Sequence, residues 1–300
     1  MSAAAPAAAP AFDLAAANAH VVAVVERASS SFSMGMKSLP PAERQAMFAI
    51  YAFCREVDDV ADEGGSTEER LAELELWRAE VASLYAGAPT RLTSLALLEP
   101  VRRFNLPQEE FLALIDGMEM DARETMHAPD MATLLLYCRR VAGTAGLLSL
   151  PIFGADEPEA PTFALALSNA LQLTNILRDI AEDAGRDRLY LPRELLLRHS
   201  IDPDLPAKTV YRHPSLAWVF RDLAREARRC YAEADRALAR CNRKRLRPAL
   251  LMMAIYEAVL DHLERTGWRP DAPPPRLSKP AKLWAALTRG LLRPVWRPST

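Results

Sequence analysis

The chain has 300 residues, of which 50% are hydrophobic and 25% are charged, and its formal net charge at pH 7 is −2. Because acids and bases nearly cancel, the molecule has no overall field that would attract nucleic acid, and we expect no nucleic-acid partner. The four cysteines lie far apart and include no CxxC pair, which argues against a disulfide framework or a zinc site and favours a reduced, cytoplasmic chain.

The composition also indicates the fold class. Glycine is scarce, and Ala, Leu, Arg and Glu dominate over Val, Ile and Thr, a balance that favours helix interiors over strands. No Gly/Ser-rich linker and no shift in composition divides the chain. We therefore predict an all-α protein with a single domain and a large core.

The first residues differ from the rest. Residues 1–19 are mostly Ala and Pro and lack a basic n-region, so we interpret them as a disordered leader and not as a signal peptide. An all-helical domain is expected over residues 20–268, with long loops near 185–212 and 270–280. Caps, breakers and periodicity predict helices over 41–63, 67–85, 91–104, 107–126, 130–149, 158–184, 213–242 and 245–266.

The first of these helices contains an acidic stripe. At about 100° per residue, Tyr51, Arg55, Asp58 and Asp62 fall on one side of the helix. Carboxylates at positions i and i+4 repel each other unless a positive charge lies between them. The pair therefore either points into bulk water or holds a cation, and for an isolated pair the solvated face is the more common explanation.

A second stripe, in "QLTNILRDIAED" (172–183), favours the cation. Gln172, Asn175, Asp179 and Asp183 share one arc with Glu182, and the opposite arc is apolar. Solvated faces are usually built from Lys and Glu, whereas Asp and Asn are poor helix formers in interior positions. Two such stripes facing each other would suit Mg²⁺ ions bound to a substrate diphosphate, whose oxygens guanidinium groups could also bind. The nearby guanidinium groups are those of Arg55, Arg178 and Arg188.

The C-terminal residues, 269–300, are rich in proline and then basic. No acid follows Asp271, and Trp284, Leu287 and Leu291 lie at helical spacing among basic residues. This pattern is typical of an amphipathic helix on an anionic membrane surface, which would place the protein peripherally on the inner face of the membrane. A short helix packed on the body of the protein is the alternative.

Five segments together resemble the squalene and phytoene synthase family, whose members join two isoprenyl diphosphates head to head. The resemblance implies the helical isoprenoid-synthase bundle with a central apolar cavity. The matching segments are "SSSFSMGMKSLP" (29–40), "AIYAFCREVDDVADE" (49–63), "YCRRVAGTAG" (137–146), "QLTNILRDIAEDAGRDRLYLP" (172–192) and "AIYEAVLDHLE" (254–264).

The resemblance also implies roles for individual residues. Asp58, Asp62, Asn175, Asp179 and Asp183 would face about two or three magnesium ions, in keeping with the oxygen ligands that magnesium prefers. Tyr51 and Tyr137 would line the reaction centre, although an ordinary core position also suits Tyr137. The residues that would contact the diphosphates or shape their pocket are Ser29, Ser31, Arg55, Gln172, Arg178, Arg188, Tyr190 and Arg276.

Within the family, the string "IDGMEMD" (115–121) and the first acidic motif are most similar to bacterial presqualene diphosphate synthases of hopanoid biosynthesis. This similarity implies two farnesyl diphosphates as substrates, no NADPH, and downstream enzymes of the pathway as partners. The alternatives are a phytoene synthase, an NADPH-dependent squalene synthase, and a catalytically silent prenyl-lipid assembly factor. Asp116 and Asp121 would either support the site or lie on a helix face. The small residues of "VAGTAG" would either permit close helix packing or leave room for a prenyl chain.

Overall fold

The computed structural model describes residues 13–28, 32–62, 65–123 and 126–267, together with Ser278, Trp284 and Thr288. In this part of the chain the regular elements are helices and no strand occurs, which confirms the predicted all-α, single-domain fold. The elements are α1 (Leu14–Ala28), α2 (Phe32–Lys37), α3 (Pro41–Asp62), α4 (Thr67–Ala86), α5 (Leu92–Phe104), α6 (Gln108–Ala122), α7 (Met131–Cys138), the π-helical η1 (Arg139–Gly143), α8 (Thr144–Phe153), α9 (Ala160–Gly185), α10 (Arg193–Arg198), α11 (Ala207–Tyr211), α12 (Leu216–Leu238) and α13 (Arg247–Thr266).

Local signals determine where several helices begin and end. Ser66 caps α4, because its side chain accepts a hydrogen bond from the Glu69 amide at 3.2 Å and the Glu69 carboxylate accepts one from the Ser66 amide at 2.8 Å. The helix ends at Gly87, whose φ of 83° is open to glycine at little cost. α3 starts directly after Pro40, as predicted.

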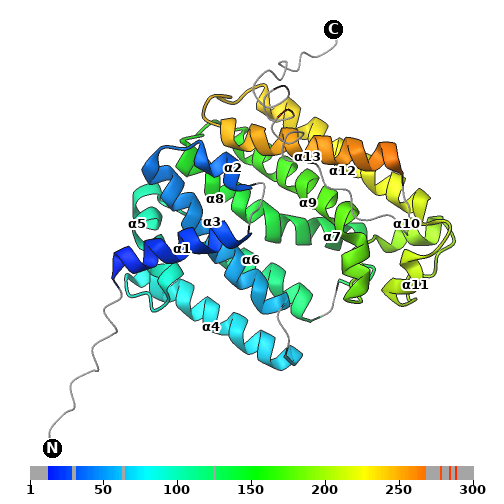
Figure 1. Ribbon diagram of the computed structural model, residues 1–300, viewed down its shortest axis with the longest axis horizontal. Helices are drawn as coiled ribbons and strands as arrows, with labels where there is room; N and C mark the ends of the chain where they lie inside the picture. Colours follow the sequence, from blue (N-terminus) through cyan, green and yellow to red (C-terminus); the bar gives the residue numbers. More distant parts are fainter. Residues whose placement is uncertain are drawn as a thin grey trace, which may run out of the picture.

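The buried residues form two apolar clusters. The first joins the helices from α1 to α6 and part of α8, and the second joins α7, part of α8 and the helices from α9 to α13. Figure 1 shows these groups side by side, the blue and cyan helices on the left and the green to orange helices on the right. Val141 and Phe153 are half-buried and pack against both clusters. The two halves therefore meet along η1 and α8.

The contact between the two halves, along η1 and α8, positions the two helices with acidic stripes. α3 of the first half and α9 of the second both pack against α8, and α9 also packs against η1 and along α12. α6 packs against α3, α8 and η1. Consequently α3, α6 and α9 all lie against α8.

The N-terminal boundary was predicted incorrectly. Residues 14–19, expected to belong to a disordered leader, form the first turns of α1. Ala17, Val21, Val24 and Val25 bury one face of this helix against the first cluster, at the spacing of a helical stripe. Residues 1–12, and the basic tail 269–300 apart from Ser278, Trp284 and Thr288, lie outside the described residues.

Two further stretches differ from expectation. The helix expected over 130–149 is interrupted by η1, where five residues adopt π-helical geometry before α8 continues to Phe153. The long loop expected over 185–212 contains the short helices α10 and α11. None of the described helices combines the length and apolarity needed to span a bilayer.

Candidate active site

The acidic stripe of α3 runs along its last two turns. Tyr51 is half-buried against the first apolar cluster, one turn before Arg55. The Arg55 guanidinium donates to Asp58 Oδ2 at 3.2 Å and also forms an ion pair with Asp59. The Arg55 guanidinium therefore neutralises part of the charge of Asp58 and Asp59 but, among the described residues, forms no ion pair with Asp62.

The second stripe lies on α9 as the periodicity predicted. Gln172, Asn175, Asp179 and Asp183 are half-buried, whereas the opposite face is buried in the second cluster. The Arg178 guanidinium donates a bidentate pair of hydrogen bonds to the Asp179 carboxylate, at 2.7 and 2.6 Å. Such charge-assisted pairs fix both side chains in one orientation.

Asn175 has an unused acceptor. Its Nδ2 donates to Gln172 Oε1 at 3.3 Å, but its buried Oδ1 accepts no hydrogen bond from the described residues. A buried polar atom without a partner costs about 1–3 kcal/mol, so the unsatisfied lone pairs of Asn175 Oδ1 are available to a water molecule or a cation. A carbonyl oxygen next to a carboxylate suits a hard cation such as Mg²⁺.

The segment after α9 brings the two stripes together. Arg188 donates to Asp62 Oδ1 at 2.5 Å and to the Ala61 carbonyl at 3.0 Å. Arg186 donates to Asp62 Oδ2 at 3.2 Å and to Glu182 at 3.1 Å. Asp62 at the end of α3 thus faces the end of α9, so the stripes share one region and do not point to opposite surfaces.

Arg186 was not identified from the sequence. Its contact with Asp62 depends on how two distant helices meet, since the two residues are 124 positions apart. Arg188 was identified from its position near the second stripe, as a possible diphosphate contact, but its contact with Asp62 was not predicted. A solvated arginine and a bridging arginine look alike in a single sequence.

Electrostatics at the site favour the binding of positive charge. Burial, followed by repulsion from Asp62, raises the pKa of Asp58 to about 7, and only Arg55 opposes the shift. Burial and then Asp179 raise the pKa of Asp183 to about 7, with Arg188 opposing. Carboxylates that hold protons near neutral pH are typical of functional sites, because a bound cation would replace the proton.

A buried acid and two tyrosines complete the region on the side of α6. The Asp121 side chain accepts hydrogen bonds from Tyr137 OH at 2.7 Å and from Tyr190 OH at 2.8 Å. The two phenol rings stack with their centroids 5.3 Å apart. Asp121 also contributes to the raised pKa of both Asp58 and Asp183, which places its charge near both stripes.

The donor set fits magnesium shared with a substrate. In the part of the chain that the structure describes, no three His, Cys, Asp or Glu side chains converge into a cage for a metal ion. The oxygens are instead divided between two helices, as carboxylate pairs with Asn175 Oδ1 beside one of them. Magnesium usually takes one or two carboxylates and completes its shell with water and substrate phosphate.

Comparison with known proteins identifies the family. The squalene/phytoene synthase family model matches residues 25–281, which is most of the chain. The chain belongs to the squalene/phytoene synthase family. The residues that match include both acidic helices and the connecting arginines.

Three relatives show how the chain lies within this family. It is 47% identical over 260 residues to the presqualene diphosphate synthase of Zymomonas mobilis, covering 86% of this chain and 88% of the relative. It is 33% identical to a chloroplastic phytoene synthase of an Oncidium hybrid cultivar, over 90% of this chain and 68% of that one. The crystal structure of squalene synthase HpnC from Alicyclobacillus acidocaldarius superposes with a TM-score of 0.77 at 29% identity, covering 86% of this chain and 96% of that chain.

Within the family fold, two glycines of "VAGTAG" serve close packing. A Cβ on Gly146 would lie 2.6 Å from Ser168 Oγ of α9, and one on Gly143 would lie 3.1 Å from Leu165. Ala142 and Ala145 are half-buried, and room for a prenyl chain beside them stays a prediction. Ser29, Ser31 and Arg276, which the family resemblance assigns to the diphosphates, lie outside the described residues.

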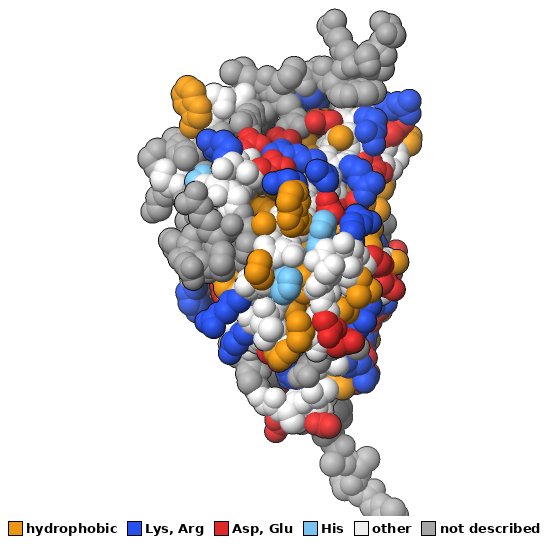
Figure 2. Space-filling model, turned by 90° about the vertical axis from the view of Figure 1, so that its right-hand side faces the viewer, with side chains coloured by type: hydrophobic (Ala, Val, Ile, Leu, Met, Phe, Trp, Pro, Cys, Tyr) orange, Lys and Arg blue, Asp and Glu red, His pale blue; other side chains and the backbone are white. Residues whose placement is uncertain are grey.

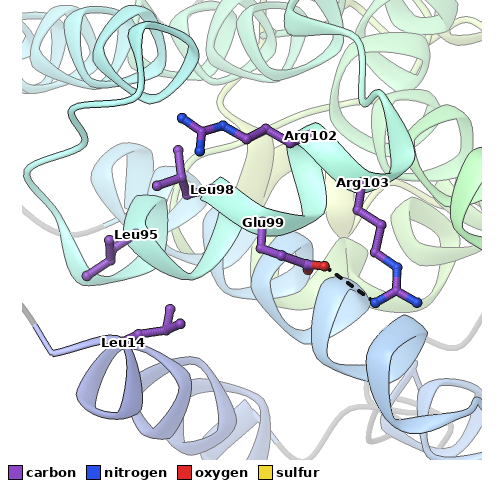
Figure 3. A pocket seen from close by; sticks show the side chains of 6 residues that line it. All are labelled: Leu14, Leu95, Leu98, Glu99, Arg102 and Arg103. Atoms are coloured by element: carbon purple, nitrogen blue, oxygen red, sulfur yellow. Dashed lines mark hydrogen bonds and ion pairs between the residues drawn. The ribbon is translucent and has the colours of Figure 1, made fainter.

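A separate pocket of about 450 Å³ lies away from the acidic stripes, between α1 and α5. Figure 3 shows Leu14 of α1 opposite Leu95 and Leu98 of α5, with Arg102 and an ion pair between Glu99 and Arg103 at the rim. This pocket contains none of the residues that the family resemblance assigns.

Proposed function

We propose that the protein joins two farnesyl diphosphates head to head, in the 1′-1 sense, to give presqualene diphosphate, diphosphate and a proton, on the route to squalene and hopanoids. The observation that carries this proposal is the meeting of the two acidic stripes at Asp62, where Arg186 and Arg188 bridge from the end of α9. The higher identity to a presqualene diphosphate synthase than to a phytoene synthase, 47% against 33%, supports this product over phytoene.

Five oxygen donors would hold the magnesium ions. Magnesium, when bound, neutralises the diphosphate and makes it a better leaving group. Without a cation, the carboxylates on α3 and α9 would repel a diphosphate. The proposed metal-facing residues are Asp58, Asp62, Asn175, Asp179 and Asp183.

Arginines and polar groups would orient the diphosphates. Arg55, Arg178 and Arg188 each lie beside a carboxylate of a stripe, and their planar guanidinium groups match phosphate oxygens. Gln172, the first residue of the α9 stripe along the chain, would contact a diphosphate or shape its pocket. Ser29, Ser31 and Arg276 are proposed diphosphate contacts from the family resemblance alone.

The reaction needs a protected cation and no side-chain nucleophile. Cleavage of the donor's carbon–oxygen bond releases diphosphate and leaves an allylic cation. The 2,3 double bond of the second farnesyl diphosphate attacks this cation, and loss of a proton closes the cyclopropane. Because water would quench the cation, the surrounding wall must be apolar, with Tyr51, Tyr137 and Tyr190 as its aromatic members.

Substrates with long prenyl chains also suit a protein near a membrane. We retain the proposal that the basic tail 269–300 contacts anionic lipid on the inner face of the membrane, with the body of the protein in the cytoplasm. Trp284 is 70% exposed, as expected of a residue that dips into a lipid surface. Co-sedimentation with anionic vesicles, compared with a chain truncated after residue 268, tests this proposal.

Product analysis tests the proposed reaction. Purified protein with magnesium and farnesyl diphosphate, without nicotinamide, is expected to accumulate presqualene diphosphate, detected by mass spectrometry, and chelation of magnesium should stop it. Phytoene from geranylgeranyl diphosphate would instead identify a phytoene synthase. Squalene formed only with NADPH would identify a squalene synthase, and no product from any prenyl diphosphate would indicate a silent assembly factor.

A further inference from the structure

Asp121 is a carboxylate in an unusual position. It lies at the end of α6 on the helix face that also buries Phe111, Leu114 and Met118, and it is only 8% exposed. Neither of its oxygens has an arginine or lysine as hydrogen-bond partner among the described residues. Instead, Oδ2 accepts from Tyr137 and Oδ1 accepts from Tyr190.

The stability of the fold does not explain this choice of residue. Burying a carboxylate among apolar side chains is unfavourable; the nearby charge of Arg188 offsets part of this cost, whereas the negative charges of Asp62 and Asp183 add to it. If an apolar residue replaced Asp121 and phenylalanine replaced both tyrosines, the same space would be filled without this cost. What a carboxylate adds is the ability to accept two hydrogen bonds at once, since an amide in its place would present one acceptor and one donor.

Two consequences follow for the tyrosines. Both hydroxyl protons point at Asp121, so neither phenol has its proton free to donate elsewhere. The two rings are held in one stack with an interplanar angle of 20°. The negative charge of the acceptor also polarises both O–H bonds, which makes the two rings more electron-rich and better able to attract a cation through their π faces.

We propose that Asp121 is a positioning residue that holds Tyr137 and Tyr190 as a paired, electron-rich aromatic wall beside the cationic centre of the reaction. Tyr137 comes from α7 and Tyr190 from the segment after α9, so Asp121 is the point that joins them across elements. The inference rests on the proposed function, because an allylic cation is what such a wall would stabilise. It assigns to α6 a role that neither acidic stripe supplies.

The test separates turnover from binding. Asp121→Asn should lower kcat by roughly 10- to 100-fold, less than the roughly 100- to 1,000-fold loss typical of a directly acting electrostatic group, because Asp121 acts through the tyrosines. The KM for farnesyl diphosphate should change by less than about threefold. The affinity for a thio-linked farnesyl diphosphate analogue, measured by calorimetry with magnesium, should likewise stay within about threefold of the wild type.

A double-mutant design shows whether Asp121 acts through the tyrosines. In a Tyr137→Phe/Tyr190→Phe background, Asp121→Asn should change kcat by less than about twofold, because the groups it positions are gone. Asp121→Leu in the same background replaces the whole cluster by apolar groups and serves if Asp121→Asn does not fold. Asp222→Asn is the control, since this carboxylate also accepts hydrogen bonds from more than one side chain, namely Arg198, His199 and Arg225, outside the site.

The outcomes distinguish this proposal from the proposed function. A folded Asp121→Asn protein with wild-type kcat would overturn the role of Asp121, and so would an equal loss of kcat with and without the two hydroxyls. A large rise in KM at unchanged kcat would also overturn it, since that result would indicate a substrate-binding role. A wild-type protein that turns over no prenyl diphosphate would overturn both proposals.

Discussion

Asp58 and Asp183 carry a cost in stability that the site requires. Each is half-buried one turn from another acid of its own stripe, and burial together with that neighbour raises the pKa of each to about 7. Like charges at i, i+4 on a helix destabilise it by about 0.2–0.5 kcal/mol. Proteins commonly accept such costs at functional sites, where removing the charge stabilises the fold and removes the activity.

Asp58→Asn should therefore stabilise the protein at pH 8 and abolish turnover. Because the folded-state pKa of Asp58, about 7, lies above the ordinary value of 3.8, the folded chain keeps a proton that the unfolded chain releases, and stability falls as pH rises between these values. Asparagine cannot ionise and avoids this loss. In thermal melts without added magnesium, we expect Tm to exceed the wild-type value by roughly 1–2 °C at pH 8 and to match it at pH 4.

The control substitution, Asp222→Asn, is expected to change Tm at pH 8 in the opposite direction. His199 donates to Asp222 and holds the pKa of that carboxyl below its ordinary value, so its contribution to stability is present above that value and is lost as pH falls through the folded pKa. Asp222→Asn should thus lower Tm at pH 8. A lower Tm for Asp58→Asn at pH 8 would contradict the interpretation of the α3 stripe.

At the scale of elements, local patterns predicted most helices and both stripes. The helix predicted over 67–85 corresponds to α4, which Ser66 caps, and the side of α9 that bears Asp179 followed from periodicity alone. α1 was missed because its alanines continue the low-complexity leader, although the buried positions Val21, Val24 and Val25 lie at helical spacing. The sequence of α1 therefore contains a hydrophobic helix face, but the alanine-rich composition led to the prediction of a disordered leader.

Other features depend on tertiary contacts and have no local signature. η1 begins at Arg139, whose guanidinium binds both oxygens of the buried Glu110 carboxylate on α6, at 2.9 and 2.7 Å. Asp121 extends the buried face of α6, a pattern that predicts burial but not its tyrosine partners. Arg186 could be placed at Asp62 only once the meeting of α3 and α9 was known.

The packing of α8 on α9 can be tested with a pair of glycines. Gly146→Ala would place a methyl group 2.6 Å from Ser168 Oγ and 3.3 Å from a carbonyl oxygen of α9, so the Ser168 side chain must rotate and the two helices must shift slightly apart. We expect a loss of about 1–3 kcal/mol in the free energy of unfolding, measured by urea denaturation. Gly185→Ala, at the end of α9 where the added methyl meets no atom within 4 Å, should be neutral or stabilising by up to about 1 kcal/mol. Equal effects of the two substitutions would contradict this account.

At the scale of the whole molecule, two apolar clusters meet at a line that the acidic helices flank. The net charge is only −2, and the face shown in Figure 2 mixes acidic and basic side chains without a field of one sign. Long-range attraction therefore contributes little to substrate capture, and local groups must bind the diphosphates. A ligand that binds between α3 and α9 would hold the two halves together.

Magnesium and diphosphate should consequently stabilise the protein only in combination. Inorganic diphosphate alone is repelled by the carboxylates of both stripes, and we expect it to raise Tm by less than about 1 °C. With magnesium present, a ligand at about 100 times its Kd adds about 2.7 kcal/mol, which corresponds to roughly 5–10 °C for a chain of this size. Asp179→Asn, which removes one carboxylate charge from the α9 stripe, should lose most of this shift and most turnover, whereas Asp222→Asn should retain both. A full shift with diphosphate alone, or in Asp179→Asn, would show that the anion binds without the proposed metal ligands.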